Sequence, residues 1–376
     1  MPEPLTPTGT TPAPHLGAQP LTQGAQPRRR RSEAWALLFA ALVLLVGAAV
    51  GTVGFLAEQA TANWRPHIAR TQTGWRITEA RMLGLSGLAL CDGHLAWQDG
   101  ASILLLDLRS GKAKLLGPGS QALTTWQPAI SERYVVWFEG RQAGALSAGA
   151  WTYDIATRRR SQIATVGDVL SLPSVSGART VWCTSGNARS QIVGVDLTNG
   201  KGFVVASEYG QPAIDGSLVA WGRSAGGGPS TFGIVDLTQD RSWTVVPSGL
   251  GGSGSLTGFD LSGRTLVWGQ QDAQTGVGRI VAQNVDTGAT SVVAEDARMA
   301  TAPSVDGDAV VWGEQTPDGA AYQVMGRRLS GGPSFQIARV DGRIQTALVS
   351  GGTVAWLVRN FAAGGPAWIE TTRLSR

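Results

Sequence analysis

The 376-residue chain is 43% hydrophobic, which provides enough apolar material for one large domain or two ordinary ones. Its formal net charge is +4, but residues 1–31 hold four Arg and one Glu, so the remaining 345 residues carry only +1. This near neutrality excludes a nucleic-acid-binding protein, because contact with a phosphate backbone requires a basic face.

The N-terminal residues predict a membrane protein. Residues 1–33 are rich in Pro, Thr, Gln, Ala and Gly, and they have too few large apolar side chains to offset the entropy of ordering. Residues 34–57 are 24 consecutive uncharged residues, which as a helix at about 1.5 Å per residue would cross a bilayer of roughly 30 Å. Four Arg precede this segment, so the positive-inside rule predicts a disordered cytoplasmic tail, one transmembrane helix and an extracytoplasmic remainder.

A cleaved signal peptide is the competing interpretation of the same segment. Its apolar region would be shorter, about 7 to 15 residues, but Ala60-Thr61-Ala62 resembles a cleavage site. Both interpretations place the rest of the chain outside the cytoplasm. We expect residues 58–71 to form a tether between the anchor and the folded domain.

A repeated tryptophan sets the expected architecture of the folded domain. Apolar runs that end in Trp recur at intervals of 39 to 47 residues, at Trp97, Trp137, Trp182, Trp221, Trp268, Trp312 and Trp356. This interval is typical of propeller blades. The 51 glycines, which lack the triplet period of collagen, fit an all-β protein with many turns.

Each repeat predicts four short strands. A first strand is followed by a tight Gly-containing turn, as at Asp215-Gly216 and Asp306-Gly307, and the second strand contains the Trp. The third strand ends near a carboxylate that we expect to cap the next turn, a group comprising Asp107, Asp154, Asp196, Asp236 and Asp286. A polar turn and a fourth strand complete the repeat.

The seventh repeat stops after its third strand. Residues 72–80, QTGWRITEA, have the pattern of a turn and a fourth strand, so we expect them to complete the last blade and close the ring. The predicted fold is therefore an all-β, seven-bladed β-propeller of four-stranded blades over residues 72–376, behind one N-terminal transmembrane helix.

The repeat unit resembles that of TolB-type propellers. Residues 212–221, PAIDGSLVAW, keep the Pro, the Asp-Gly turn and the closing aromatic of that family's unit, although they lack its second Pro and Ile214 replaces an aromatic. The resemblance covers about residues 72–376. It implies a propeller and, for function, the role of a periplasmic scaffold.

The sequence offers little material for catalysis or metal binding. The three His, at positions 15, 67 and 94, are scattered, and we expect His94 to be an exposed turn residue. The Gly-rich stretch 249–258 lacks the Lys-Ser/Thr end of a phosphate loop. Cys91 and Cys183 lack metal-ligand spacing and are expected to be small buried apolar residues. We predict no catalytic residue, no metal site and no cofactor.

A candidate binding site comes from residues that vary within the repeat. The residue two positions after each Trp differs from unit to unit, and we expect these residues to begin the loop between the second and third strands: Asp99, Glu139, Thr184, Arg223, Gln270, Glu314 and Val358. The loops that lead into first strands, which open on the same face, carry further aromatic and amide groups. The candidate binding residues are Trp126, Gln127, Glu139, Tyr209, Gln211, Arg223 and Glu314.

These features favour a binding or scaffold module for an envelope protein or polymer, held in the membrane by residues 34–57. An envelope enzyme on a propeller is the alternative, either a polysaccharide lyase or hydrolase or a quinone-dependent dehydrogenase. The last of these is opposed by the absence of its Ala-x-Asp-x-x-x-Gly-x-x-x-Trp docking repeat. A sensor that signals through the helix is a third possibility.

Overall fold

The computed structural model describes residues 66–80, 87–100, 102–117, 123–141, 148–186, 189–223, 231–247, 254–272, 275, 277–360 and 367–374. The predicted tail 1–33 and the predicted membrane helix 34–57 lie outside these residues. Within the described ranges, no helix is long and apolar enough to span a membrane.

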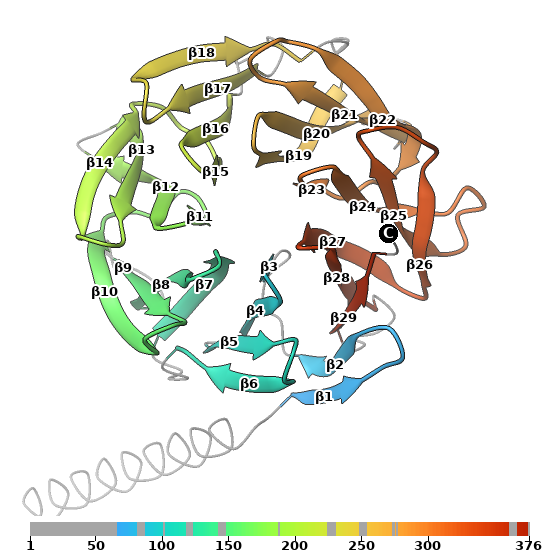
Figure 1. Cartoon of the computed structure of the whole chain (residues 1–376), viewed down its shortest axis with the longest axis horizontal. Helices are drawn as coiled ribbons and strands as arrows, with labels where there is room; N and C mark the ends of the chain where they lie inside the picture. The colour runs from blue at the N-terminus through green and yellow to red at the C-terminus, as the bar shows by residue number, and fades with distance from the viewer. Residues whose placement is uncertain are drawn as a thin grey trace, which may run out of the picture. The chain divides into compact units, whose positions relative to one another are not determined.

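The described chain forms seven antiparallel sheets (Figure 1). Blade 1 contains β3 (Leu88–Cys91), β4 (His94–Asp99), β5 (Ser102–Asp107) and β6 (Lys112–Leu115). Blade 2 contains β7 (Leu123–Ile130), β8 (Tyr134–Arg141), β9 (Ala148–Asp154) and β10 (Arg159–Val166). Blade 3 contains β11 (Ser174–Ser176), β12 (Arg179–Gly186), β13 (Arg189–Asp196) and β14 (Lys201–Ala206).

The remaining blades repeat this order from the inside of the ring outward. Blade 4 contains β15 (Pro212–Asp215), β16 (Leu218–Arg223), β17 (Thr231–Asp236) and β18 (Arg241–Val245). Blade 5 contains β19 (Gly254–Ser262), β20 (Thr265–Asp272), β21 (Val277–Asn284) and β22 (Thr290–Arg298). Blade 6 contains β23 (Ser304–Asp306), β24 (Ala309–Gln315), β25 (Tyr322–Arg328) and β26 (Phe335–Val340). Blade 7 contains β27 (Arg343–Ser350), β28 (Thr353–Arg359), β29 (Ala367–Arg373), β2 (Trp75–Ala80) and β1 (His67–Arg70).

The seven inner strands contact one another in a closed cycle, in the order β3, β7, β11, β15, β19, β23, β27 and back to β3. Figure 1 shows the same arrangement as blades set around a central axis. The prediction of a seven-bladed, all-β propeller is therefore confirmed.

The N-terminal strand closes the ring as predicted, because β2 pairs with β29 and supplies the fourth strand of blade 7. The structure adds a fifth strand. Residues His67–Arg70, which the sequence analysis placed in the tether 58–71, form β1 and pair with β2 from His67↔Thr78 to Arg70↔Trp75. The folded domain therefore begins before residue 72, because the outer edge of β2 offers free backbone groups to the preceding segment.

The repeated Trp residues occupy the second strand of every blade and are almost completely buried, with exposed fractions of 0% to 4%. They pack in clusters that join neighbouring blades. Trp268, for example, lies with Phe232 of the preceding blade, and their ring centroids are 5.6 Å apart. The repeat is therefore a packing device, since each Trp fills the space between two sheets.

A belt of hydrogen bonds ties successive inner strands together. The last residue of an inner strand accepts a hydrogen bond from a backbone N–H in the turn of the next blade. The pairs are Ser176 with Gly216 (3.0 Å), Asp215 with Gly263 (2.6 Å), Ser262 with Gly307 (3.0 Å) and Asp306 with Gly351 (2.7 Å). The Asp-Gly and Ser-Gly pairs therefore do more than form turns, because their side chains also hold adjacent blades together.

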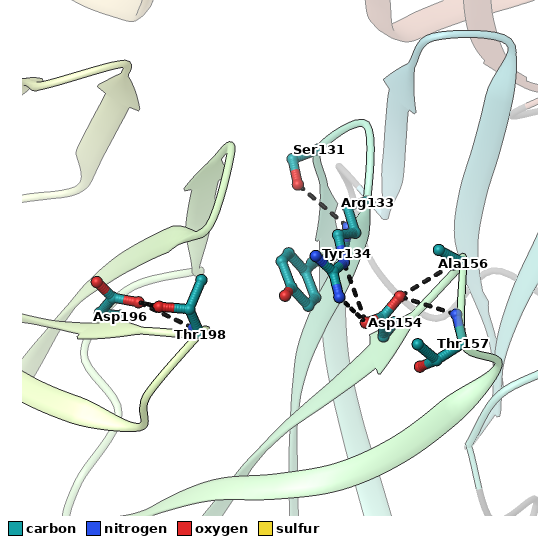
Figure 2. A network of polar contacts seen from close by, with 8 residues as sticks. All are labelled: Ser131, Arg133, Tyr134, Asp154, Ala156, Thr157, Asp196 and Thr198. Atoms are coloured by element: carbon teal, nitrogen blue, oxygen red, sulfur yellow. Dashed lines mark hydrogen bonds and ion pairs between the residues drawn. The ribbon is translucent and has the colours of Figure 1, made fainter.

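The carboxylates at the ends of third strands cap the following turns, as predicted. Asp154 Oδ1 accepts hydrogen bonds from the backbone N–H groups of Ala156 (2.9 Å) and Thr157 (3.1 Å) (Figure 2). Arg133 donates to Asp154 Oδ2 at 2.8 Å. This bond from Arg133, followed by the backbone bonds, lowers the pKa of Asp154. These bonds make Asp154 a structural carboxylate.

One member of that predicted group was assigned to the wrong position. Asn284, not Asp286, ends the third strand of blade 5, and its Oδ1 accepts from the N–H groups of Asp286 and Thr287, both at 3.0 Å. An amide oxygen performs the same cap as a carboxylate oxygen, so Asn284 can end the third strand of blade 5 where Asp ends that of blades 1 to 4.

Both cysteines are free thiols. Cys183 is buried as expected, whereas Cys91 is half-buried, and burial followed by the nearby Glu132 carboxylate raises its pKa to about 12. The expectation of an exposed His94 was wrong. His94 begins β4, is half-buried, and its Nδ1 is buried without a partner among the described residues.

Asp260 makes the stability of the propeller depend on pH. Its Oδ2 accepts from the Val305 N–H (2.9 Å) and the Ser304 hydroxyl (3.1 Å) of the next blade. Burial is the largest effect on this carboxyl and outweighs those bonds, so its pKa rises from 3.8 to about 6. Between pH 4 and 6 the Asp260 carboxyl is therefore protonated in the folded protein but ionised in the unfolded chain. Its contribution to the free energy of unfolding falls as the pH rises through this range.

We therefore expect Asp260→Asn to flatten the pH profile of stability. The free energy of unfolding of the wild type, relative to Asp260→Asn, should fall by about 2 kcal/mol between roughly pH 4 and pH 7. Denaturant titrations across this range measure it. Asp196→Asn is the control, because the Thr198 hydroxyl lowers the pKa of Asp196 and its effect should be confined to pH values below about 4. A difference in the free energy of unfolding between the wild type and Asp260→Asn that stays constant across this pH range would contradict the prediction.

Candidate functional site

The positions two residues after each Trp lie inside strands. Asp99, Glu139, Thr184, Arg223, Gln270, Glu314 and Val358 all fall within β4, β8, β12, β16, β20, β24 and β28. The expectation that they begin the loops was wrong, because the second strands run past the Trp by two or more residues. Whether they bind a ligand therefore depends on what their side chains contact.

Glu139 and Glu314 contact the Trp of their own strand. Trp137 Nε1 donates to Glu139 Oε1 at 2.6 Å, and Trp312 Nε1 donates to Glu314 Oε2 at 2.7 Å. Glu139 is only 5% exposed. Each carboxylate therefore satisfies a buried indole N–H, a structural role that the sequence analysis did not predict.

A second partner holds Glu139 in place. Arg160 of β10 donates to both Glu139 carboxylate oxygens, at 2.8 and 2.6 Å. The Arg160 guanidinium also lies 4.0 Å from the centroid of a Trp151 ring. This ion pair and cation–π contact join three strands of blade 2.

In blade 4 a different residue accepts the hydrogen bond from the buried indole N–H. Arg223 occupies the position two after Trp221, and the acceptor for the Trp221 indole is Glu208, from the segment between β14 and β15, at 2.8 Å. Arg223 Nε and Nη2 donate to the two Glu208 oxygens at 2.5 and 2.8 Å, and Nη1 donates to Thr244 of β18 at 2.7 Å. Arg223 therefore links a loop, the Trp strand and the outer strand of the blade.

Two exposed large side chains adjoin this network in the sequence. Tyr209, which follows Glu208, is 64% exposed, and Val246, two residues beyond Thr244, is 62% exposed. Residues 244 and 246 point to the same side of an extended segment. We call Glu208, Tyr209, Arg223, Thr244 and Val246 the blade 4 crown.

The loop that carries Tyr209 is anchored by its neighbour Gln211. The Gln211 side chain accepts a hydrogen bond from the Leu172 N–H at 3.0 Å and donates to the Leu172 carbonyl at 3.1 Å. These bonds tie the loops that lead into blades 3 and 4. Gln211 therefore positions Tyr209, and the exposed Tyr209 ring remains available for contact.

Electrostatics in the crown favour a fixed ion pair. Burial raises the pKa of Glu208, but hydrogen bonds from Arg223 and Trp221 outweigh burial and lower it overall. Glu208 is thus a carboxylate at neutral pH and holds the Arg223 guanidinium in one orientation. The guanidinium lies 5.2 Å from the centroid of the Trp221 ring.

The structure brings together only part of the predicted binding set. Arg223 lies in blade 4 and Tyr209 and Gln211 lie in the segment that leads into it, whereas Glu139 lies in blade 2 and Glu314 in blade 6. Trp126 and Gln127 lie in β7, which begins at Leu123, instead of in a loop, and Gln127 is half-buried.

Sequence reasoning missed Glu208, Thr244 and Val246. Glu208 lies outside the repeat position that was compared, and its neighbour Tyr209 was the only feature that pointed to it. Thr244 lies in the outer strand β18 and Val246 directly follows that strand, which varies in length between blades and has no repeated marker. Within the described part of the chain, no group of three His, Cys, Asp or Glu residues has the geometry of a metal site.

Comparisons with known proteins bear on the fold. No family model matches the chain, and no curated protein is a significant match. A prolyl endopeptidase structure has a TM-score of 0.57 and 13% identity over 77% of this chain, and this chain covers 50% of it. An oligogalacturonate lyase in complex with manganese has a TM-score of 0.53 and 13% identity over 83% of this chain and 96% of its own.

TolB from Acinetobacter baumannii is also similar, with 15% identity over 71% of this chain and 77% of its own, but its TM-score is 0.45. At 13% identity, the likeness to the endopeptidase and the lyase shows the β-propeller fold alone, and no comparison assigns the chain to the TolB-type family. The chain spans half the length of the prolyl endopeptidase chain that it matches. The same fold serves peptidases, a lyase and other proteins, so the fold does not decide between binding and catalysis.

Proposed function

We propose that this protein is a membrane-anchored, extracytoplasmic binding module that docks an envelope protein through the blade 4 crown. The observation that carries the proposal is the 64% exposure of Tyr209 beside the fixed Arg223–Glu208 ion pair. Tyr and Arg are enriched among the residues that contribute most to protein–protein binding. In this proposal the anchor is residues 34–57 and the propeller acts as a scaffold.

The arrangement of the crown supports a protein ligand. Rigid aromatic side chains lose little conformational entropy on binding, and Tyr209 is held on a loop that Gln211 fixes at both of its amide atoms. Val246 adds an exposed apolar contact. An envelope polymer is the competing ligand, and an envelope lyase, hydrolase or dehydrogenase is the competing function.

The crown can be tested by affinity purification of the full-length protein after cross-linking in intact cells. We expect the double variant Tyr209→Ala/Val246→Ser to recover its protein partner about tenfold less well than the wild type, because loss of two central contacts typically costs about 1–2 kcal/mol or more. The control is Leu115→Ser, which removes a 43% exposed apolar side chain from the outer strand of blade 1.

Three results would count against the proposal. Equal partner recovery from the wild type and the crown variant would exclude the crown as the docking site. An equal loss in Leu115→Ser would show that the effect is not specific to blade 4. Turnover of envelope glycans by the purified protein would favour the enzyme alternative. Glu139 and Glu314 are left unchanged in this test, because they satisfy buried indole groups and their loss would destabilise the fold.

A further inference from the structure

A groove of about 490 Å³ separates blades 3 and 4 at their outer strands. Its apolar walls include Phe203 and Val204 from β14 and Leu237 from the turn after β17, and Val204 is 62% exposed. Charged side chains surround these walls. The volume lies in the range of pockets that bind small molecules or single large side chains.

Two other blade junctions show what fills the corresponding space. Trp75 of β2 donates its indole N–H to the Leu108 carbonyl of blade 1 at 2.8 Å. Trp243 of β18 donates in the same way to the Val285 carbonyl of blade 5 at 3.1 Å. In both cases the acceptor follows the end of a third strand, at Asp107 or Asn284. A Trp from one blade therefore seals the corner of the next.

The junction between blades 3 and 4 lacks this Trp. Phe203 occupies the equivalent position. It lies opposite Gly194, two residues before the end of the third strand of blade 3, as Trp243 lies opposite Ile234 in blade 4. Its ring lies over Gly194, where an added Cβ would come within 2.4 Å of Phe203 Cζ. Phe has no N–H to donate, and among the described residues none donates to the Leu237 carbonyl. The Leu237 carbonyl at the groove therefore lacks the indole donor that the Leu108 and Val285 carbonyls have.

Charge around the groove favours an acidic ligand. Arg179, Lys201 and Arg241 line it together with three Asp residues. One of these, Asp236, is neutralised from outside the lining by Arg264 at 3.3 Å. Lys201 forms no ion pair with any described residue. The Lys201 ammonium group is therefore a cation at the rim that can pair with an acidic ligand.

We propose that this groove binds the indole side chain of a partner polypeptide in which an acidic residue adjoins the Trp. The indole occupies the space that Trp75 and Trp243 fill at their own junctions and donates its N–H to the Leu237 carbonyl. The neighbouring carboxylate pairs with Lys201. This site is separate from the crown and does not depend on it, because the groove involves Phe203 and Lys201 and the crown involves Tyr209 and Arg223.

The probe for this site is the dipeptide N-acetyl-Trp-Asp-amide, and the measurement is saturation-transfer NMR with the full-length protein at about 5 mM peptide, above the roughly millimolar affinity expected for so small a ligand. N-acetyl-Ala-Asp-amide and N-acetyl-Trp-Lys-amide are the comparison peptides. We expect only the Trp-Asp peptide to give strong saturation transfer. No signal from it, or an equal signal from the Ala-Asp peptide, would overturn the proposal.

Matched variants locate the site. Phe203→Trp should fill the groove and weaken Trp-Asp binding about tenfold, while the melting temperature stays equal or rises. Ser291→Trp makes the same change at the equivalent position of blade 5, where Ala282↔Ser291 matches Gly194↔Phe203, and should leave binding unchanged. Equal binding by wild type and Phe203→Trp, or an equal loss in Ser291→Trp, would overturn the proposal.

A surface substitution tests the charge independently of packing. Lys201→Glu should reverse the preference between the Trp-Asp and Trp-Lys peptides. Lys112→Glu is the control. Lys112 lies opposite Asp107 in the strand register of blade 1, as Lys201 lies opposite Asp196 in that of blade 3. An unchanged preference in Lys201→Glu would overturn the acidic part of the proposal. Crown variants should bind the dipeptide normally, which separates a failure of this site from a failure of the crown.

Discussion

Deletion of residues 1–80 is expected to abolish cooperative folding of the propeller. The deletion removes β2, which supplies the fourth strand of blade 7. Ile77 is 0% exposed and packs in a core cluster with Leu95 and Trp97 of blade 1, so losing this side chain alone should cost about 2–5 kcal/mol. Trp75 and its bond to the Leu108 carbonyl are lost as well. Together these losses approach the whole stability of a typical domain, about 5–15 kcal/mol.

A shorter deletion provides the matched control. Removing residues 1–71 takes away β1 but leaves β2, and two of the four β1 residues are exposed. We expect this variant to unfold cooperatively with a loss of about 1 kcal/mol, because an exposed edge strand contributes little buried surface. Thermal unfolding by circular dichroism measures both variants. An unchanged melting temperature after deletion of residues 1–80 would contradict closure of the ring by β2.

Substitution of Glu139 is expected to give the second large effect. Glu139→Ala should lower the free energy of unfolding by about 2–4 kcal/mol, because it leaves the Trp137 indole N–H unsatisfied and the Arg160 guanidinium without its bidentate partner. The Glu139 side chain is 4% exposed and that of Arg160 is 32% exposed, so water only partly compensates. Urea titration measures the loss.

Two comparisons identify the cause of the Glu139 effect. Glu139→Gln keeps an oxygen that can accept the indole hydrogen bond, so it should cost less than Glu139→Ala. Arg109→Ala removes an ion pair to Asp92 whose side chains are 72% and 58% exposed, and it should change stability by less than about 0.5 kcal/mol. A Glu139→Ala protein as stable as Arg109→Ala would show that the buried pair contributes nothing.

The two sites differ in how far the sequence predicted them. Arg223 was predicted because its position varies within the repeat, and Tyr209 because it is an aromatic residue on a loop that leads into a first strand. The structure joins them through Glu208, a residue outside the repeated positions. The groove was not predicted at all. Phe203 lines it at the position that Trp243 holds in blade 4, and that equivalence appears only when strands are paired in register.

Glu139 and Glu314 show why variability alone is an incomplete guide to function. Each lies two residues after a repeated Trp, and the sequence cannot tell whether such a side chain points to solvent or back toward the indole. The structure shows both carboxylates bonded to an indole N–H. The direction of the side chain depends on how far the second strand extends past the Trp. The variable loop that follows hides the end of this strand in the sequence.

The sequence by itself determined the number of blades, the position of each central Trp and the closure of the ring by residues 72–80. It did so because packing one sheet against the next requires the same apolar side chains in every blade, and this requirement leaves a period in the chain. Only the tertiary structure decided the crown, the groove and the strand His67–Arg70. These features arise from side chains and strand edges that meet across blades, tens of residues apart in the chain, and no local pattern records which of them will touch.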